Sequence, residues 1–121
     1  MGDTQALEPD DVMTATDQHG QIAHQSLIDH SLRLERTLHE VSDGVWCLVG
    51  NGLSNQTFVT APDGIIAIDT GESIEEMRDA LIELRTVTDA PIVAVIYTHF
   101  HYVSGTQAIL DTEPVEEIWG H

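Results

Sequence analysis

The chain begins with a polar stretch and then shows a helical period. Residues 1–22 mix acidic, amide and hydroxyl side chains without a sustained apolar period, so we predict a mobile acidic leader there. Between residues 23 and 41, apolar side chains recur at spacings of seven, four and three, namely Leu27, Leu34, Leu38 and Val41. This spacing predicts one amphipathic helix at the start of a folded domain that spans residues 23–121.

The pattern then changes to short apolar runs of strand length. Residues 45–50 and 55–60 are two such runs joined by a polar loop, which predicts an antiparallel hairpin. A turn over residues 61–64 leads into residues 65–69, whose nearly continuous apolar character predicts a strand buried on both faces.

Helical and strand patterns alternate over the remainder of the chain. Ser73 with Glu76 three residues later predicts a capping box at the start of a helix. A buried strand over residues 92–98, a short helix over 106–112 and an edge strand over 115–119 are expected to follow. The fold class that we predict is therefore α/β, an antiparallel meander leading into a strand-helix-strand parallel unit.

Charge and cysteine content exclude several classes of partner. The chain has 21 acidic residues against four arginines and no lysine, which gives a formal charge of −17. Such a surface repels phosphate groups, so we expect no nucleic acid and no membrane partner, and adaptation to high salt. Cys47 is the single cysteine, no apolar run approaches the length of a membrane span, and the N-terminus is acidic, so we expect a cytoplasmic protein.

Polar side chains with possible chemistry follow two of the predicted strands. Asp69 ends the first buried strand, and His99 and His101 follow the second. The carboxyl ends of neighbouring parallel strands converge, so these groups should face one pocket. In extended backbone, two histidines spaced by two residues project to the same side, where both imidazoles could bind one metal ion such as zinc. The Asp69 carboxylate would then orient one of the two imidazoles without itself binding the metal.

Other interpretations of the same residues stay open. The two histidines could simply form hydrogen bonds with the backbone at the strand end. Asp69 could cap backbone amides of its turn, which does not exclude an orienting role. The triplet Asp69-Thr70-Gly71 also matches the signature of aspartic proteases, so a retropepsin-like subunit is a remote alternative, although a helical period follows the triplet directly.

Two blocks of sequence resemble the metallo-β-lactamase fold hydrolases, and within them the alkyl sulfatase-like branch. They are "SNQTFVTAPDGIIAIDTGES" and "VIYTHFHYVSGT", and the resemblance covers roughly residues 41–121. The resemblance implies a metallo-β-lactamase-like N-terminal half-domain and zinc-dependent hydrolysis of a small-molecule ester or sulfate ester. His99 and His101 match the first two zinc ligands of the family motif, and Asp69 would steady one of them.

The chain also departs from the family motif. Val103 and Ser104 stand where the family motif has an aspartate and a further histidine, so at most one zinc ion per site is expected. The family's later ligands are also absent from this sequence, and His121 is one candidate for a third ligand. The alternative is a non-catalytic remnant or self-associating interaction module, and either case favours a homo-oligomer or a complementing half-domain as partner.

Overall fold

The computed structural model describes residues 13–121, and it divides the chain into two compact units, Met1–Glu35 and Arg36–His121. In the first unit, two short strands pair as an antiparallel hairpin and are followed by one helix and a 3₁₀ turn. These elements are β1 (Thr14–Thr16), β2 (Ile22–His24), α1 (Gln25–Ser31) and η1 (Leu32–Leu34). Most of the leader expected over residues 1–22 lies outside the described residues.

The prediction of a single helix between residues 23 and 41 is wrong. The helix is confined to α1, and its predicted C-terminal part is instead the strand β3 (Thr37–Ser42). In β3, Leu38 pairs with Leu48 of the neighbouring strand and packs against the core. Leu27, Leu34 and Val41 are exposed, so their helix-like spacing does not mark a buried face.

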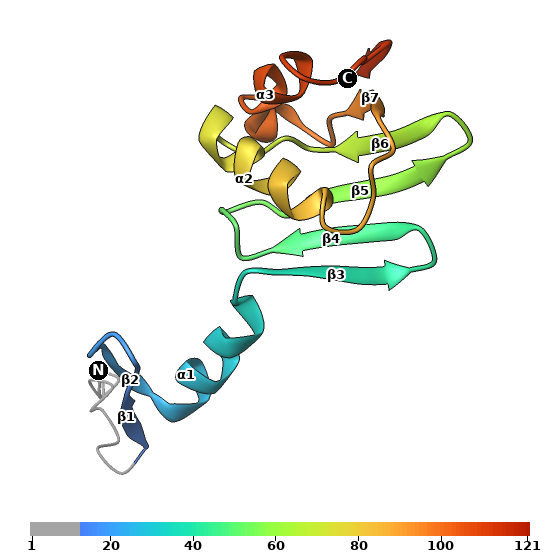
Figure 1. The fold of residues 1–121 in the computed structure, drawn as a ribbon. Coiled ribbons are helices and arrows are strands. Elements are labelled where there is room, and N and C mark those ends of the chain that lie inside the picture. Colours follow the sequence, from blue (N-terminus) through green and yellow to red (C-terminus); the bar gives the residue numbers. More distant parts are fainter. Residues whose placement is uncertain (1–12) are drawn as a thin grey trace, which may run out of the picture. The chain divides into compact units, whose positions relative to one another are not determined.

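The second unit is built on one mixed sheet of six strands in the order β3-β4-β5-β6-β7-β8 (Figure 1). Strands β3 to β6 are antiparallel neighbours, whereas β6, β7 and β8 run parallel to one another. After β3 the strands are β4 (Val45–Val49), β5 (Gln56–Ala61), β6 (Gly64–Ile68), β7 (Ile92–Ile96) and β8 (Glu117–Trp119). The predicted meander leading into a parallel unit is confirmed, with β8 at the edge as expected.

Two helices, α2 (Ile74–Leu84) and α3 (Thr106–Leu110), complete the core of this unit. The sheet contributes the fully buried side chains of Leu48, Phe58 and Val95, which cluster with buried residues of both helices. Because a strand is pleated, alternate side chains of β6 point to the opposite face of the sheet, where Ile66 and Ile68 are only half-buried. The expectation that this strand is buried on both faces is therefore wrong.

Helix α2 begins as the sequence predicts, with one change. Ser73 Oγ accepts the Glu76 backbone N–H at 3.0 Å, which is the forward half of a capping box. The Glu76 carboxylate does not return to Ser73. It accepts the Glu72 backbone N–H at 3.0 Å and the Gln56 side-chain amide at 2.7 Å, which joins the helix start to the first residue of β5.

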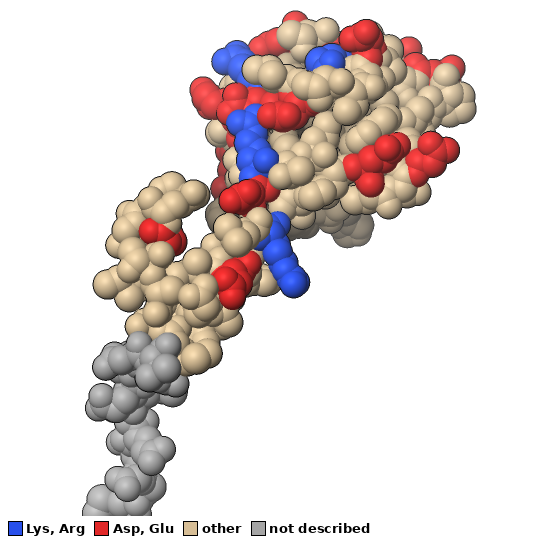
Figure 2. Space-filling model, turned by 60° about the horizontal axis from the view of Figure 1, so that its bottom comes forward, with Lys and Arg blue, Asp and Glu red and all other residues tan. Residues whose placement is uncertain are grey.

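Among the charged side chains on the face drawn in Figure 2, the acidic ones (red) are more widespread than the basic ones (blue). The few blue patches are arginines, since the chain has no lysine. Arg36 lies 3.3 Å from Glu83, and Arg78 lies 3.8 Å from Asp111, so both cations have acidic neighbours. Within residues 13–121, no helix has the length and apolar character needed to cross a membrane.

Candidate functional site

Asp69 stands directly after β6 in a strained backbone conformation. Its φ of 59° is the only positive value for a non-glycine residue among those described. This left-handed conformation costs of order 1 to 3 kcal/mol and persists only where surrounding contacts fix it. The residue is 8% exposed, so Asp69 is largely withdrawn from solvent.

Both oxygens of the Asp69 carboxylate bind the same residue, Thr98. Oδ1 accepts the Thr98 backbone N–H at 2.9 Å, and Oδ2 accepts the Thr98 hydroxyl at 2.7 Å. The hydroxyl oxygen in turn lies 2.8 Å from Nδ1 of His99. The expected orienting role of Asp69 therefore has a physical route, although it runs through Thr98 and not by direct contact with the imidazole.

Thr70, the next residue, holds the other end of the histidine segment. Its backbone N–H and its hydroxyl both donate to the Tyr102 carbonyl oxygen, at 2.9 and 3.1 Å. The Thr70 hydroxyl also lies 3.1 Å from the hydroxyl of Thr106 at the start of α3. Asp69 and Thr70 together thus fix the chain just before His99 and just after His101.

The two histidines lie together, but not in the extended strand that their spacing predicts. Strand β7 ends at Ile96, His99 is extended, and a 3₁₀ turn, η2 (Phe100–Tyr102), contains His101. The ring centroids of His99 and His101 are 5.1 Å apart with the ring planes at 77°. The ring of Phe100 lies against that of His101, with the two ring centroids 3.9 Å apart.

The described residues supply only part of a zinc site. Catalytic zinc usually has three protein ligands and an open position. His99 and His101 bring two imidazoles together, but residues 13–121 contain no cluster of three or more histidine, cysteine or acidic side chains placed to hold a metal ion. The donor set is therefore incomplete for a catalytic metal, and no reaction step can be assigned through one.

A small pocket of about 210 Å³ joins the ends of β7 and β8 beside this turn. It is lined by Tyr97, His99, Phe100, Val103, Gly120 and His121. His121 thus lies on the same pocket as His99, but it does not complete a three-ligand cluster with the other two histidines.

Sequence reasoning missed the two threonines that organise this site. Thr98 lies between the expected carboxylate and the expected imidazole, and Thr70 fixes the far side of the turn. The sequence does contain a pattern that points to them, since a threonine directly precedes His99 and another directly follows Asp69.

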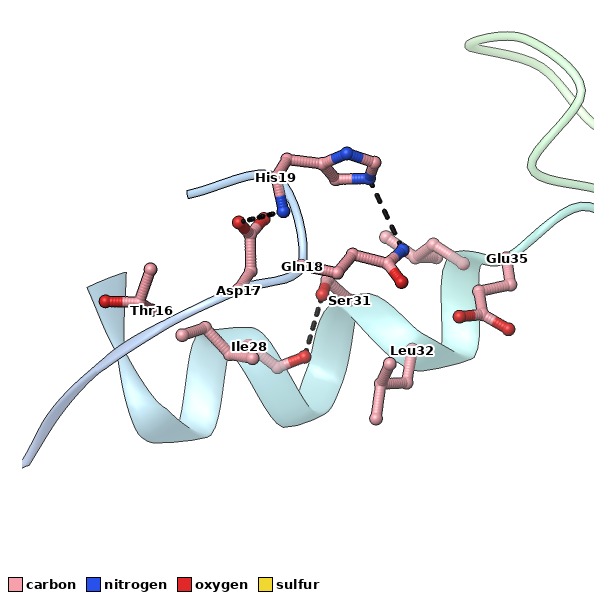
Figure 3. A pocket seen from close by; sticks show the side chains of 9 residues that line it. Thr16, Asp17, Gln18, His19, Ile28, Ser31, Leu32 and Glu35 are labelled. Carbon is pink, nitrogen blue, oxygen red and sulfur yellow. Dashed lines mark hydrogen bonds between the residues drawn. The ribbon is translucent and has the colours of Figure 1, made fainter. Parts of the chain in front are cut away.

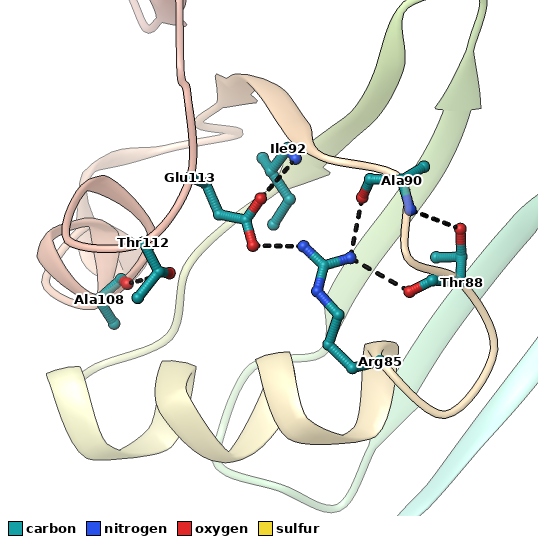
Figure 4. A network of polar contacts seen from close by, with 7 residues as sticks. All are labelled: Arg85, Thr88, Ala90, Ile92, Ala108, Thr112 and Glu113. Carbon is teal, nitrogen blue, oxygen red and sulfur yellow. Dashed lines mark hydrogen bonds and ion pairs between the residues drawn. The ribbon is translucent and has the colours of Figure 1, made fainter.

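Other hollows of the described chain are lined by neither His99 nor His101, and two of them have notable polar contacts. One of about 410 Å³ belongs to the first unit, where the Asp17 carboxylate accepts the backbone N–H of His19 at 2.8 Å (Figure 3). The same carboxylate also accepts the backbone N–H of Gln21 at 2.8 Å. These bonds, chiefly that from Gln21, lower the pKa of Asp17. The other, of about 620 Å³, lies between α2 and α3 beside the ion pair of Arg85 and Glu113 (Figure 4). Neither contains a cluster of metal-binding type within the described residues.

A mixed sheet with helices between its parallel strands β6, β7 and β8 places the second unit in the α/β class. Residues 49–119 match the family model described as the Metallo-beta-lactamase superfamily, and the chain belongs to this family. The matched segment includes Asp69, His99 and His101. The family resemblance seen in the sequence is confirmed, and the fold rules out the retropepsin-like alternative.

Individual relatives point to the alkylsulfatase branch. A linear primary-alkylsulfatase from a Pseudomonas species is 43% identical over 60 residues, which are 48% of this chain and 11% of the relative. The match therefore covers only about a tenth of that enzyme's length. The structure of an inverting sec-alkylsulfatase from Pseudomonas sp. has a TM-score of 0.65 at 23% identity, covering 79% of this chain and 19% of that one.

A metallo-β-lactamase from Pseudomonas aeruginosa, solved in its mono-zinc form, is similar in fold. Its TM-score is 0.55 at 21% identity, with 68% of this chain and 40% of that chain covered. At these identities both structural likenesses show the fold alone. The fold predicted from the sequence is thereby confirmed.

Proposed function

We propose that this chain is the histidine-bearing part of a zinc-dependent hydrolase that acts on sulfate esters. His99 and His101 would contribute two ligands to a single zinc ion, and the remaining ligands would come from residues outside this chain. The zinc ion would supply an activated water and polarise the ester. The contribution of this chain is to place two imidazoles at the end of β7 and to fix them.

One observation carries this proposal. The segment that matches the family model also contains a pair of imidazoles whose turn is tied at both ends to Asp69 and Thr70. Two exposed histidines without a ligand to bind would not need such support. The similarity to alkylsulfatases is what favours a sulfate ester over other esters.

The partners follow from the same proposal. The substrate would be a small-molecule sulfate ester, and the site would be completed by a complementing half-domain or by another copy of the chain. The half-buried face of the sheet, with Ile66 and Ile68, is the surface such a partner would cover. The charge of −17 makes a nucleic acid or an anionic membrane an unfavourable partner and fits a soluble, salt-adapted, cytoplasmic protein.

Zinc binding by the purified chain tests the proposal. Calorimetric titration should show one weak zinc site that is lost in both His99→Ala and His101→Ala. His39→Ala is the matched control, because His39 is an exposed histidine on β3, and it should leave zinc binding unchanged. A chain that binds no zinc, or whose zinc binding survives both substitutions, would overturn the proposal.

The incomplete donor set favours a second candidate, a non-catalytic module that associates with itself. Val103 and Ser104 occupy the positions at which the family motif has ligands, and the described residues contain no third ligand. Mass measurement in solution separates the two proposals when combined with an assay of sulfate release from a short alkyl sulfate. A metal-free oligomer without turnover supports the module, whereas zinc-dependent release that is lost in His101→Ala supports the hydrolase.

A further inference from the structure

The hydroxyl of Thr98 lies between two groups that compete for one proton. Its oxygen is 2.7 Å from Asp69 Oδ2 and 2.8 Å from His99 Nδ1. A threonine hydroxyl can donate one hydrogen bond and accept two. Asp69 and His99 must therefore each either accept the hydroxyl proton or donate to the hydroxyl oxygen. Only one of the two can be the acceptor.

The Asp69 carboxylate determines which neighbour accepts the hydroxyl proton of Thr98. An ionised carboxylate has acceptors only, so its contact with the Thr98 oxygen requires the hydroxyl proton. The other oxygen, Oδ1, is already engaged by the Thr98 backbone N–H, which fixes the direction of the carboxyl group. The hydroxyl oxygen then offers only lone pairs to the imidazole, and Nδ1 of His99 has to be the donor.

We propose that Thr98 is a positioning residue, which, held by Asp69, keeps the proton of the neutral His99 ring on Nδ1 and leaves Nε2 as its unprotonated nitrogen. The ring is exposed, so packing alone would not select one tautomer or one orientation. His101 provides the contrast, because its ring makes aromatic contacts with its neighbours but no hydrogen bond within the described part of the chain.

The arrangement prepares His99 to bind a ligand through Nε2. Histidines that bind metals usually donate their other ring N–H to a partner, which fixes the tautomer and the ring direction. The use of Nε2 for a metal rests on the proposed function, whereas the position of the proton on Nδ1 does not. The tautomer can therefore be tested in the chain without any metal.

Two-bond proton–nitrogen NMR correlations of the ¹⁵N-histidine-labelled full chain report the tautomer of each ring. The spectra should be recorded at about pH 8.5, where an imidazole of ordinary pKa is neutral. We expect the wild type to show a protonated Nδ1 and an unprotonated Nε2 for His99. Thr98→Val removes the hydroxyl while keeping the shape of the side chain and its backbone N–H, and should shift His99 to a mixture of tautomers. Thr98→Ser keeps a hydroxyl and should restore the wild-type pattern.

Asp69→Asn gives a sharper test, because it should reverse the direction of the hydrogen bonds. The asparagine oxygen would accept the Thr98 backbone N–H, so its amide nitrogen would donate to the Thr98 oxygen. The hydroxyl proton would then go to His99 Nδ1, and the ring would carry its proton on Nε2. His101 should not change in any of these variants, and backbone amide spectra would show that each variant is folded.

Two results would overturn the proposal. One is a wild-type His99 protonated on Nε2, and the other is a Thr98→Val spectrum in which the His99 signals are the same as in the wild type. Zinc titration of the same samples separates this inference from the proposed function. A protonated Nδ1 without zinc binding would leave the positioning role standing while the proposed metal site fails.

Discussion

Asp69 and Thr98, 29 residues apart in the chain, are joined by two hydrogen bonds of 2.9 and 2.7 Å that use both carboxylate oxygens. The pair connects the ends of the parallel strands β6 and β7, and so connects the acidic turn to the histidine turn. Because one carboxyl group binds both the backbone and the side chain of Thr98, it fixes the direction of the hydroxyl that contacts His99.

Gly105 is a position at which any side chain should disrupt the site. A Cβ atom there would overlap the Thr70 carbonyl oxygen and would lie 2.6 Å from Cβ of Met77. Gly105→Ala should therefore lower the free energy of unfolding by about 2 to 3 kcal/mol, as expected for overpacking against backbone. Thermal or urea unfolding monitored by circular dichroism would measure the loss.

Gly120→Ala is the matched control for this substitution. A Cβ atom at Gly120 would meet only the Tyr97 side chain, at 3.2 Å, and that ring can shift. The change in unfolding free energy should be about 0.5 kcal/mol or less, as for ordinary surface substitutions. Equal losses in the two variants would contradict the close packing of Gly105 against Thr70.

Arg85, which directly follows α2 as its C-cap residue, should stabilise the fold far more than Arg78, which lies within the helix. Arg85 pairs with Glu113, whose side chain is only 10% exposed, and donates to the carbonyl oxygens of Thr88 and Ala90. Arg85→Met should cost about 2 kcal/mol, since it leaves a largely buried carboxylate without its cation.

The comparison variant is Arg78→Met, because Arg78 and its acidic neighbour Asp111 are both solvent-exposed and 3.8 Å apart. Exposed ion pairs contribute about 0 to 1 kcal/mol, so this variant should unfold close to the wild type. Urea unfolding of both variants would decide the matter, and a smaller loss for Arg85→Met than for Arg78→Met would refute the prediction.

The Glu76 carboxylate should matter more than the adjacent Glu75 carboxylate. Glu76 accepts hydrogen bonds from the buried Gln56 side chain and from the Glu72 backbone, whereas Glu75 is exposed. Glu76→Ala should cost about 1 to 3 kcal/mol, because the buried amide of Gln56 loses a partner. Glu75→Ala should change the unfolding free energy by less than about 0.5 kcal/mol. Equal effects in chemical denaturation would contradict this assignment.

Acid should open the turn between β1 and β2. Hydrogen bonds from the backbone of Gln21 and His19 lower the pKa of Asp17 below its ordinary value. A lowered carboxyl pKa stabilises the folded turn above the ordinary pKa, and this stabilisation is lost as the pH falls through the folded-state value. Amide chemical shifts of His19 and Gln21 should therefore move together in an acid titration.

The control for the acid titration is Asp17→Asn. The asparagine oxygen can still accept the two N–H groups but has no carboxyl group to protonate, so the coordinated acid transition should disappear. A transition that persists in Asp17→Asn would show that another group is responsible.

Salt should stabilise the chain. With a formal charge of −17 and no lysine, the folded state carries strong self-repulsion, and the screening length falls to about 3 Å in 1 M salt. The midpoint of thermal unfolding should rise from dilute buffer to molar KCl. A midpoint that stays constant would argue against adaptation to high salt.

The sequence predicts the sheet and α2 well because their signals are local. The apolar run of β6 and the cap at Ser73 are enough to place a strand and a helix, and both are confirmed. The stretch from residue 23 to residue 41 misleads because its apolar spacing combines residues of α1, η1 and β3. Only the long-range pairing of Leu38 with Leu48 makes part of it a strand, and no local pattern contains that pairing.

The site shows the same division between local and long-range information. Order and spacing along the chain are enough to identify Asp69, His99 and His101 as candidates. They do not show that β7 ends at Ile96, that a 3₁₀ turn holds His101, or that Thr98 stands between Asp69 and His99. Those features depend on contacts between residues far apart in the sequence.

The left-handed backbone of Asp69 places two demands on residue 69. Glycine adopts a φ of 59° without strain, but it would remove the carboxylate that accepts the Thr98 backbone N–H and hydroxyl. Asparagine also tolerates this backbone region and keeps a side-chain oxygen that can accept a hydrogen bond. A library of variants screened for folding should therefore recover aspartate and asparagine at position 69 ahead of the other residue types with a side chain.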